Sequence, residues 1–255
     1  MKIALFSDIH ANLPALEAMF SDMEKHQPDL MLCLGDLVGY HVWPNEVVHE
    51  IRRRNIPCIA GNYDYGIGRS LDECGCAYKS DDEKAMGKVS IAYTNQMTSK
   101  ESKDYLCSLP QHLRFDFQIA EEAISILLVH GSPRKINEYL FEDRPEESLL
   151  RIMEQANTDV LFFGHTHKPF HKVLYSESKS KYLHAVNTGS VGKPKDGNPK
   201  GSYVILELNE QSSLQKKDGI NPVFHRFEYE VERSALALED SPLPKAYADM
   251  LRRGA

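Results

Sequence analysis

The sequence predicts an α/β fold with two facing sheets, and three observations lead to this prediction. Short apolar runs alternate with helically spaced apolar residues over residues 2–60. Strand-like runs separated by Gly, Pro, Asn and Ser turns then dominate residues 160–230. The chain has 255 residues, of which 42% are hydrophobic and 26% charged, so it can bury a full core. We therefore expect one domain over residues 1–255.

The first part of the chain predicts strands joined by helices. The expected strands are Lys2–Phe6, Leu30–Leu34 and Ile56–Ala60, and the helices between them begin after Asn12 and at Pro44. This alternation predicts a parallel sheet with right-handed crossovers. In such a sheet the functional loops lie at the carboxyl ends of the strands.

The rest of the chain predicts a helical insertion and then more strands. Residues 71–108 are mostly polar with helical spacing, and the tail from about residue 240 to 255 is expected to be loosely held. The expected elements in between are the strands Leu113–Phe117, Ala123–Val129, Val160–Phe163, Phe170–Tyr175, Tyr182–Asn187, Tyr203–Leu208 and Val223–Glu230, and the helices Glu146–Gln155 and Ala235–Glu239.

Composition excludes several classes of protein. With 30 basic and 37 acidic residues the net charge is −7, which argues against an extended nucleic-acid-binding surface. No apolar stretch approaches the roughly 18 residues of a transmembrane helix, and the first residues do not resemble a signal peptide. Five cysteines without a secretion signal are typical of reduced thiols, so we expect a cytoplasmic protein with no membrane partner.

Residues of metal-binding type follow the strand-like runs. They are Asp8, His10, Asp36, Asn62, His130, His165 and His167. Alternate residues of an extended segment point the same way, so Asp8 and His10 could converge on one site, as could His165 and His167. Each residue alone is typical of a cap or a turn. Together, at the ends of five strand-like runs, they predict a mixed nitrogen and oxygen site suited to first-row transition metals.

These residues lie in segments that resemble the five motifs of the calcineurin-like metallophosphoesterases. The segments are Asp8-Ile9-His10, Gly35-Asp36, Gly61-Asn62-Tyr63-Asp64, Val129-His130-Gly131 and Gly164-His165-Thr166-His167. Their order and spacing match over nearly the whole chain, and the chain looks most similar to the small bacterial and archaeal phosphodiesterase branch. The resemblance implies a four-layer α/β/β/α sandwich of two mixed sheets flanked by helices.

The resemblance also implies two divalent metal ions. Asp8, His10 and His167 would hold the first ion, Asn62, His130 and His165 the second, and Asp36 would bridge them. Mn²⁺ is the expected metal, with Fe, Ni, Co, Zn or Mg as alternatives. The expected reaction is in-line attack by a metal-bridging hydroxide on small-molecule phosphodiesters, and on phosphomonoesters as well.

One motif residue departs from the family pattern. Most members carry His where this chain has Tyr63, and the following acid, here Asp64, orients that His. A phenol is a poor proton donor at neutral pH, so substrates with acidic leaving groups should be favoured. His41 is the candidate replacement donor, with an exposed loop His as the alternative. Asn12 and Arg134 are candidate contacts for the substrate phosphate, and Asn12 is equally well explained as a helix cap.

Alternatives remain at this point. A protein Ser/Thr phosphatase and a catalytically weak metal-binding scaffold for a protein partner share the same motifs, and the oligomeric state, including a homo-oligomer, is open. Lys193, Lys195 and Lys200 lie in a Gly/Pro-rich loop, where they either steer anionic substrates or are simply solvated.

Overall fold

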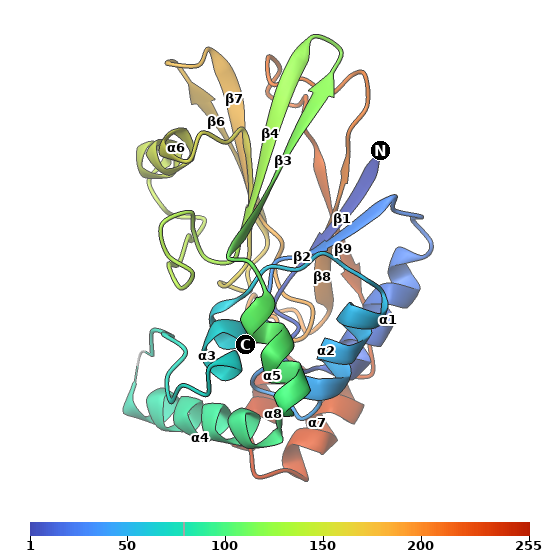
Figure 1. Cartoon of the computed structure of the whole chain (residues 1–255), viewed down its shortest axis with the longest axis vertical. Coiled ribbons are helices and arrows are strands. Elements are labelled where there is room, and N and C mark those ends of the chain that lie inside the picture. The colour runs from blue at the N-terminus through green and yellow to red at the C-terminus, as the bar shows by residue number, and fades with distance from the viewer. Residues whose placement is uncertain (79) are drawn as a thin grey trace.

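Two sheets form the centre of the computed structural model, which describes residues 1–78 and 80–255 (Figure 1). The four-stranded sheet has the order β2-β1-β8-β9, with strands β1 (Lys2–Phe6), β2 (Leu30–Cys33), β8 (Gly201–Glu207) and β9 (Pro222–Phe227). The five-stranded sheet has the order β3-β4-β5-β7-β6, with strands β3 (His112–Ile119), β4 (Glu122–Val129), β5 (Val160–Phe163), β6 (Phe170–Ser176) and β7 (Lys181–Asn187). Both sheets contain parallel and antiparallel pairs.

Helices cover the outer faces of the two sheets. They are α1 (Leu13–Met23), α2 (Pro44–Arg53), α3 (Asn62–Gly68), α4 (Asp81–Met97), α5 (Lys100–Ser108), α6 (Glu146–Gln155), α7 (Val231–Glu239) and α8 (Ala246–Arg253). Figure 1 shows α6 beside the larger sheet and α1 and α2 beside the smaller one, while the remaining helices gather at one end. No helix among the described residues is both long enough and apolar enough to cross a bilayer.

Three apolar clusters hold these layers together. One lies between the sheets and joins Ile3 and Leu5 of β1 to Ile126 of β4 and Phe162 of β5. A second packs α1, α2, α7 and α8 on the smaller sheet, and a third packs α6 on the larger sheet. Burial of both faces of each sheet explains why the central strands read as continuous apolar runs. The predicted sandwich of two mixed sheets flanked by helices is confirmed.

Two expectations about elements were wrong. Ile56–Ala60 is not a full strand, and the structure gives this segment only a single bridge between Cys33 and Cys58. Pro57 has no backbone N–H to donate, which limits pairing along the edge of β2. The expected loose tail is instead held by α8, whose Tyr247 and Leu251 are buried in the cluster on the smaller sheet.

Candidate metal centre

The ends of four strands and the start of one helix deliver the seven ligand-type residues to one place. Asp8 and His10 follow β1, and Asp36 follows β2. In the other sheet the residues His130, His165 and His167 follow β4 and β5, and Asn62 begins α3. The parallel pairs β1 with β2 and β4 with β5 both end on this side, so each sheet contributes three of the seven residues and α3 contributes the seventh. All seven side chains are buried.

The first cluster contains Asp8, His10 and His167. The Nε2 atoms of His10 and His167 lie 3.1 Å apart. Asp8 Oδ1 lies 3.7 Å from His10 Nε2 and 3.2 Å from His167 Nε2. Each ring approaches a backbone carbonyl with Nδ1, Val38 O at 3.0 Å for His10 and Lys193 O at 2.5 Å for His167. A neutral ring that donates from Nδ1 has a lone pair on Nε2. Three acceptor atoms therefore face one another, which is the donor set of a cation site.

The second cluster contains Asp36, His130 and His165, with Asn62 beside it. His130 Nε2 lies 3.1 Å from Asn62 Oδ1 and 3.4 Å from Asp36 Oδ2, while its Nδ1 approaches Leu34 O at 2.8 Å. His165 Nε2 is buried without a hydrogen-bond partner among the described residues. This cluster also brings imidazole nitrogens and carboxylate and amide oxygens to a common point, a mixed donor set suited to first-row transition metals.

Asp36 lies between the two clusters. Its Oδ2 is 3.5 Å from His10 Nε2 in the first cluster and 3.4 Å from His130 Nε2 in the second. Its Oδ1 accepts a hydrogen bond from the Tyr63 backbone N–H at 2.8 Å, which fixes the carboxylate plane. Asp36 is the carboxylate placed to serve both clusters.

Groups around the ligands orient them. Asp8 Oδ2 accepts hydrogen bonds from Ser7 Oγ at 2.5 Å and from the His165 N–H at 3.0 Å, which leaves Oδ1 without a partner in the described chain. Asn62 Nδ2 donates to Cys74 O at 2.7 Å, so its Oδ1 faces the cluster. Such outer contacts orient ligands and tune metal affinity. The orienting roles of Ser7 and the Cys74 carbonyl could not be predicted from the sequence, because they depend on contacts made after folding.

The electrostatics fit a cation. Burial lowers the pKa of His10 and His165 well below the ordinary value and that of His167 to about 4, which favours the neutral ring, the form that binds metal. Burial opposes charge on Asp8, yet the imidazoles beginning with His167 hold the pKa of Asp8 below its usual range. For His130, burial is outweighed by Asp36, which raises the pKa to about 10. The carboxylates thus stabilise positive charge at this point.

The backbone is strained at most ligand positions. Asp8, His10, Asp36, His165 and His167 have φ of 55°, 52°, 56°, 66° and 59°. Left-handed φ costs roughly 1–2 kcal/mol for a residue with a Cβ, and such strain gathers at functional sites. Gly61 relieves crowding nearby, because a Cβ there would lie 2.1 Å from Asp36 Oδ1.

Tyr63 and Asp64 do not form a proton-donating pair. Tyr63 is 1% exposed, packs its ring edge-on to His10 with centroids 5.4 Å apart, and its hydroxyl has no hydrogen-bond partner among the described residues. Burial raises the pKa of Tyr63 well above its ordinary value. Asp64 accepts from the backbone N–H groups of Asp36, Leu37 and Gly61 at 2.7 to 2.9 Å. Asp64 therefore positions the Asp36 loop rather than a side chain at residue 63.

The three other predicted contacts lie in different surroundings. His41 is buried rather than exposed, its Nδ1 lies 2.9 Å from His10 O, and burial lowers its pKa to about 3, so the ring is neutral. Asn12 is fully buried, donates to Gly192 O at 2.8 Å and accepts from Ser234 Oγ at 2.7 Å. These bonds and its place as the cap of α1 support a structural role.

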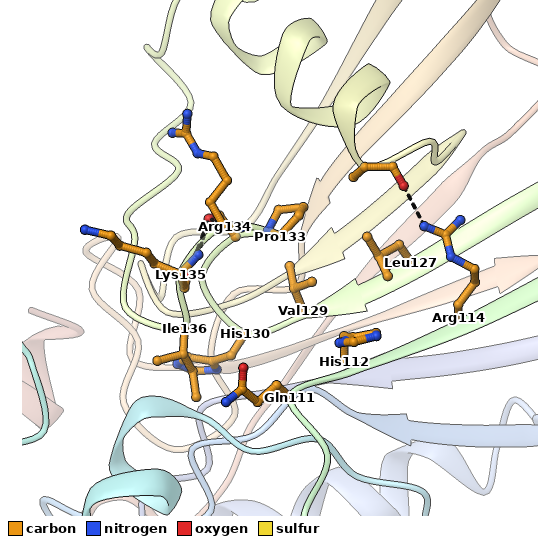
Figure 2. Close-up of a pocket in the computed structure, with 12 residues that line it drawn as sticks. Gln111, His112, Arg114, Leu127, Val129, His130, Pro133, Arg134, Lys135 and Ile136 are labelled. Atoms are coloured by element: carbon orange, nitrogen blue, oxygen red, sulfur yellow. Dashed lines mark hydrogen bonds between the residues drawn. The ribbon is translucent and has the colours of Figure 1, made fainter.

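Arg134 lies on the wall of a separate cavity of about 250 Å³ (Figure 2). Its guanidinium is directed away from His130 and pairs with Glu138. The second wall of this cavity includes Arg114, whose guanidinium donates to Ala156 O at 2.6 Å. The structure therefore brings Arg134 near the backbone of the centre without aiming its charge at the metal ligands.

Comparison with known proteins places this geometry in a family. Residues 1–211 match the model of the calcineurin-like phosphoesterase superfamily domain. The chain is 33% identical over 270 residues to the uncharacterised protein MJ0912 of Methanocaldococcus jannaschii, covering 99% of this chain and 98% of that one. It is 29% identical over 230 residues to the phosphodiesterase YfcE of Escherichia coli strain K12, covering 87% of this chain and all of YfcE.

The fold agrees with these matches. The crystal structure of a metallophosphoesterase from Sphaerobacter thermophilus superimposes with a TM-score of 0.73 at 29% identity, over 100% of this chain and 99% of that one. A family match over most of the sequence, a full-length relative above 30% identity and the two converging His/Asp clusters agree. The chain belongs to the calcineurin-like phosphoesterase superfamily.

Proposed function

We propose that the protein is a dinuclear metal-dependent phosphodiesterase that also accepts phosphomonoesters of small molecules. Membership in a phosphoesterase family makes it a hydrolase of phosphoric esters. The finer proposal rests on the two buried clusters and on the position of Asp36 relative to them. Asp36 Oδ2 lies within 3.5 Å of a histidine nitrogen of each cluster. The convergence of all seven ligand-type residues favours an enzyme over a metal-binding scaffold.

The residues fit a pair of divalent ions. Asp8, His10 and His167 would hold one, His130, His165 and Asn62 the other, and Asp36 both. When bound, such a pair lowers the pKa of water and stabilises charge on phosphoryl oxygens. Two carboxylates supply only two negative charges against four positive ones, which leaves the centre attractive to an anionic ester. We expect Mn²⁺ to support the highest activity, with Fe, Ni, Co, Zn and Mg as alternatives.

Side chains beside the centre determine whether the leaving oxygen receives a proton as it departs. Tyr63 is held in its neutral form by burial and offers a phenol, which is a weak acid. The neutral His41 ring has Nδ1 beside a carbonyl oxygen, so its Nε2 carries a lone pair rather than a proton. Because neither of these two described side chains is a strong acid, esters of acidic alcohols should react fastest.

Two experiments test this proposal. After chelation, the protein should hydrolyse bis-p-nitrophenyl phosphate and p-nitrophenyl phosphate when Mn²⁺, Ni²⁺ or Mg²⁺ is restored, whereas the D8N variant should lose at least 100-fold in kcat/KM. The D104N variant on the exposed face of α5 is the matched control and should behave as wild type. Absence of hydrolysis with every metal would contradict the proposal.

The leaving-group prediction has its own variants. Tyr63→His restores the residue that the family pattern carries and should raise kcat on alkyl esters by roughly 10²-fold or more, the usual contribution of general acid catalysis. Tyr63→Phe should leave that rate within twofold, because the hydroxyl has no partner. A large loss in Tyr63→Phe would show that the phenol is the proton donor.

A further inference from the structure

A cavity of about 460 Å³ lies beside the metal centre. Segments far apart in the sequence line it, including the loop after β2, the residues before α4, the loop after β5, the loop before β8 and the helix α8. Its volume is within the range of small-molecule sites. This cavity is lined by none of the seven predicted ligands and does not include Arg134, so the proposed function assigns it no role.

The cavity shares its walls with the metal ligands. The Tyr40 ring packs edge-on to His10 with centroids 4.8 Å apart, and the Tyr139 ring lies 4.0 Å from that of His165. The backbone carbonyl of Lys193, another lining residue, faces His167 Nδ1 at 2.5 Å. An ester whose phosphoryl group lies at the centre would therefore extend its other part into this cavity.

Aromatic rings dominate the apolar side of the cavity. They belong to Tyr40, Tyr78, Tyr139, Phe141 and Tyr247. The Tyr139 and Phe141 rings stack with an interplanar angle of 8° and centroids 5.5 Å apart. Aromatic faces at the wall of a cavity bind planar rings by stacking, and this tolerates different ring types.

Two lysine side chains place their amino groups in the same space. Lys193 is 6% exposed, and its Nζ lies 4.8 Å from the Tyr40 ring centroid and 5.8 Å from that of Tyr247. Lys195 Nζ lies 5.9 Å from the Tyr40 ring centroid. Within residues 1–78 and 80–255 neither ammonium forms an ion pair with a carboxylate. Contact with aromatic faces offsets only part of the cost of burying a charge, so an anion would complete this arrangement.

Burial lowers the pKa of both lysines, and nearby carboxylates oppose this shift by favouring the charged form. Glu83 is the acidic side chain among the described lining residues, and its charge acts on both lysines through space. Asp8 and Asp36 act on Lys195, but both carboxylates belong to the metal ligand set. Cations bound at the centre would neutralise the Asp8 and Asp36 carboxylates. An anionic ligand in the cavity would then stabilise the charged form of the lysines.

We propose that this cavity binds the non-reacting part of the substrate and that this part carries a planar aromatic ring and a second phosphate group. Lys193 and Lys195 contact that second phosphate, and the tyrosines contact the ring. The substrate class is then a nucleotide-like phosphodiester with an additional phosphate. This rests on the proposed phosphodiesterase function, because the reacting phosphate is placed at the metal centre.

A pair of substrates that differ only in the second phosphate tests the proposal. One is the p-nitrophenyl ester of thymidine 5′-phosphate, and the other is the same ester with a 3′-phosphate. With Mn²⁺ the wild-type protein should show a kcat/KM at least tenfold higher for the 3′-phosphorylated ester, mainly through KM. A ratio near one in the wild type would overturn the proposal.

Variants locate the effect. In the K193M/K195M double variant the ratio of the two kcat/KM values should fall to within twofold of one, and using a ratio cancels any change in the shared chemistry. The matched control is Lys200→Met, in the same loop but paired with Glu228 at 2.8 Å and outside the cavity, and it should keep the wild-type ratio. A double variant that keeps the full ratio would show that the two lysines only balance the acidic ligands.

A binding measurement separates this proposal from the proposed function. Calorimetric titration of the chelated protein with thymidine 3′,5′-bisphosphate and with thymidine needs no hydrolysis. The bisphosphate should bind at least tenfold more tightly, and the double variant should lose that advantage. Binding without hydrolysis of either ester would contradict the phosphodiesterase function and keep the cavity assignment. Hydrolysis of both esters with equal binding of the two ligands would contradict the cavity assignment alone.

Discussion

Replacement of Asp36 by Asn is the sharpest test of a shared ligand, because it keeps the shape of the side chain and removes its charge. Oδ2 lies 3.5 Å from His10 Nε2 and 3.4 Å from His130 Nε2, so one atom faces both clusters. At an effective dielectric of about 20, two unit charges 4 Å apart interact by about 4 kcal/mol, and a divalent ion doubles this. Even about a third of the doubled value, near 2.7 kcal/mol, is a 100-fold change in affinity.

The prediction concerns the number of ions as well as their affinity. Isothermal titration of the chelated protein with Mn²⁺ should give two sites in the wild type and one in His167→Gln or His130→Gln, since each removes a ligand from a single cluster. D36N should weaken both sites by at least 100-fold. The reasoning is refuted if D36N binds two ions with wild-type affinity or loses only one of them.

The remaining predictions concern stability in the chelated protein. His167 has φ of 59°, so His167→Gly should be more stable than His167→Ala by about 1 kcal/mol in urea unfolding, and equal stabilities would argue against strain there. Burial lowers the pKa of His184 to about 3 in the folded state against 6.5 unfolded, so its contribution is complete above pH 6.5 and declines as the pH falls towards 3. At pH 5 the wild type should have lost about 2 kcal/mol through this group, a loss that His184→Gln should not show, and parallel pH curves for the two proteins would disprove it.

The sequence anticipated most of the strands and the convergence of the ligand-type residues because both leave local signals. Apolar runs ending in Asp, His or Asn mark where strands meet the site, and these residues do converge. Pro57 shows the limit of such patterns, since one missing donor reduces an apolar run to a single bridge.

Features that depend on long-range packing could not be predicted in this way. Lys193 reads as a solvated loop residue in the sequence, yet folding buries it against Tyr40 and Tyr247. His41 likewise reads as exposed and is buried. Tyr247 comes from a tail that local composition marks as loose, and it becomes a wall of the cavity only because α8 packs on α7.

The left-handed backbone at five ligand positions has a consequence for how such a site changes over generations. While metal binding is under selection, Asp and His are kept there at a thermodynamic cost that the rest of the fold tolerates. In a descendant released from that selection, glycine at these positions would be favoured by stability alone. In such a descendant, glycine substitutions should therefore appear first at Asp8, His10 or His167. Asn62 and His130 do not have positive φ, so glycine would not stabilise the backbone at these two positions.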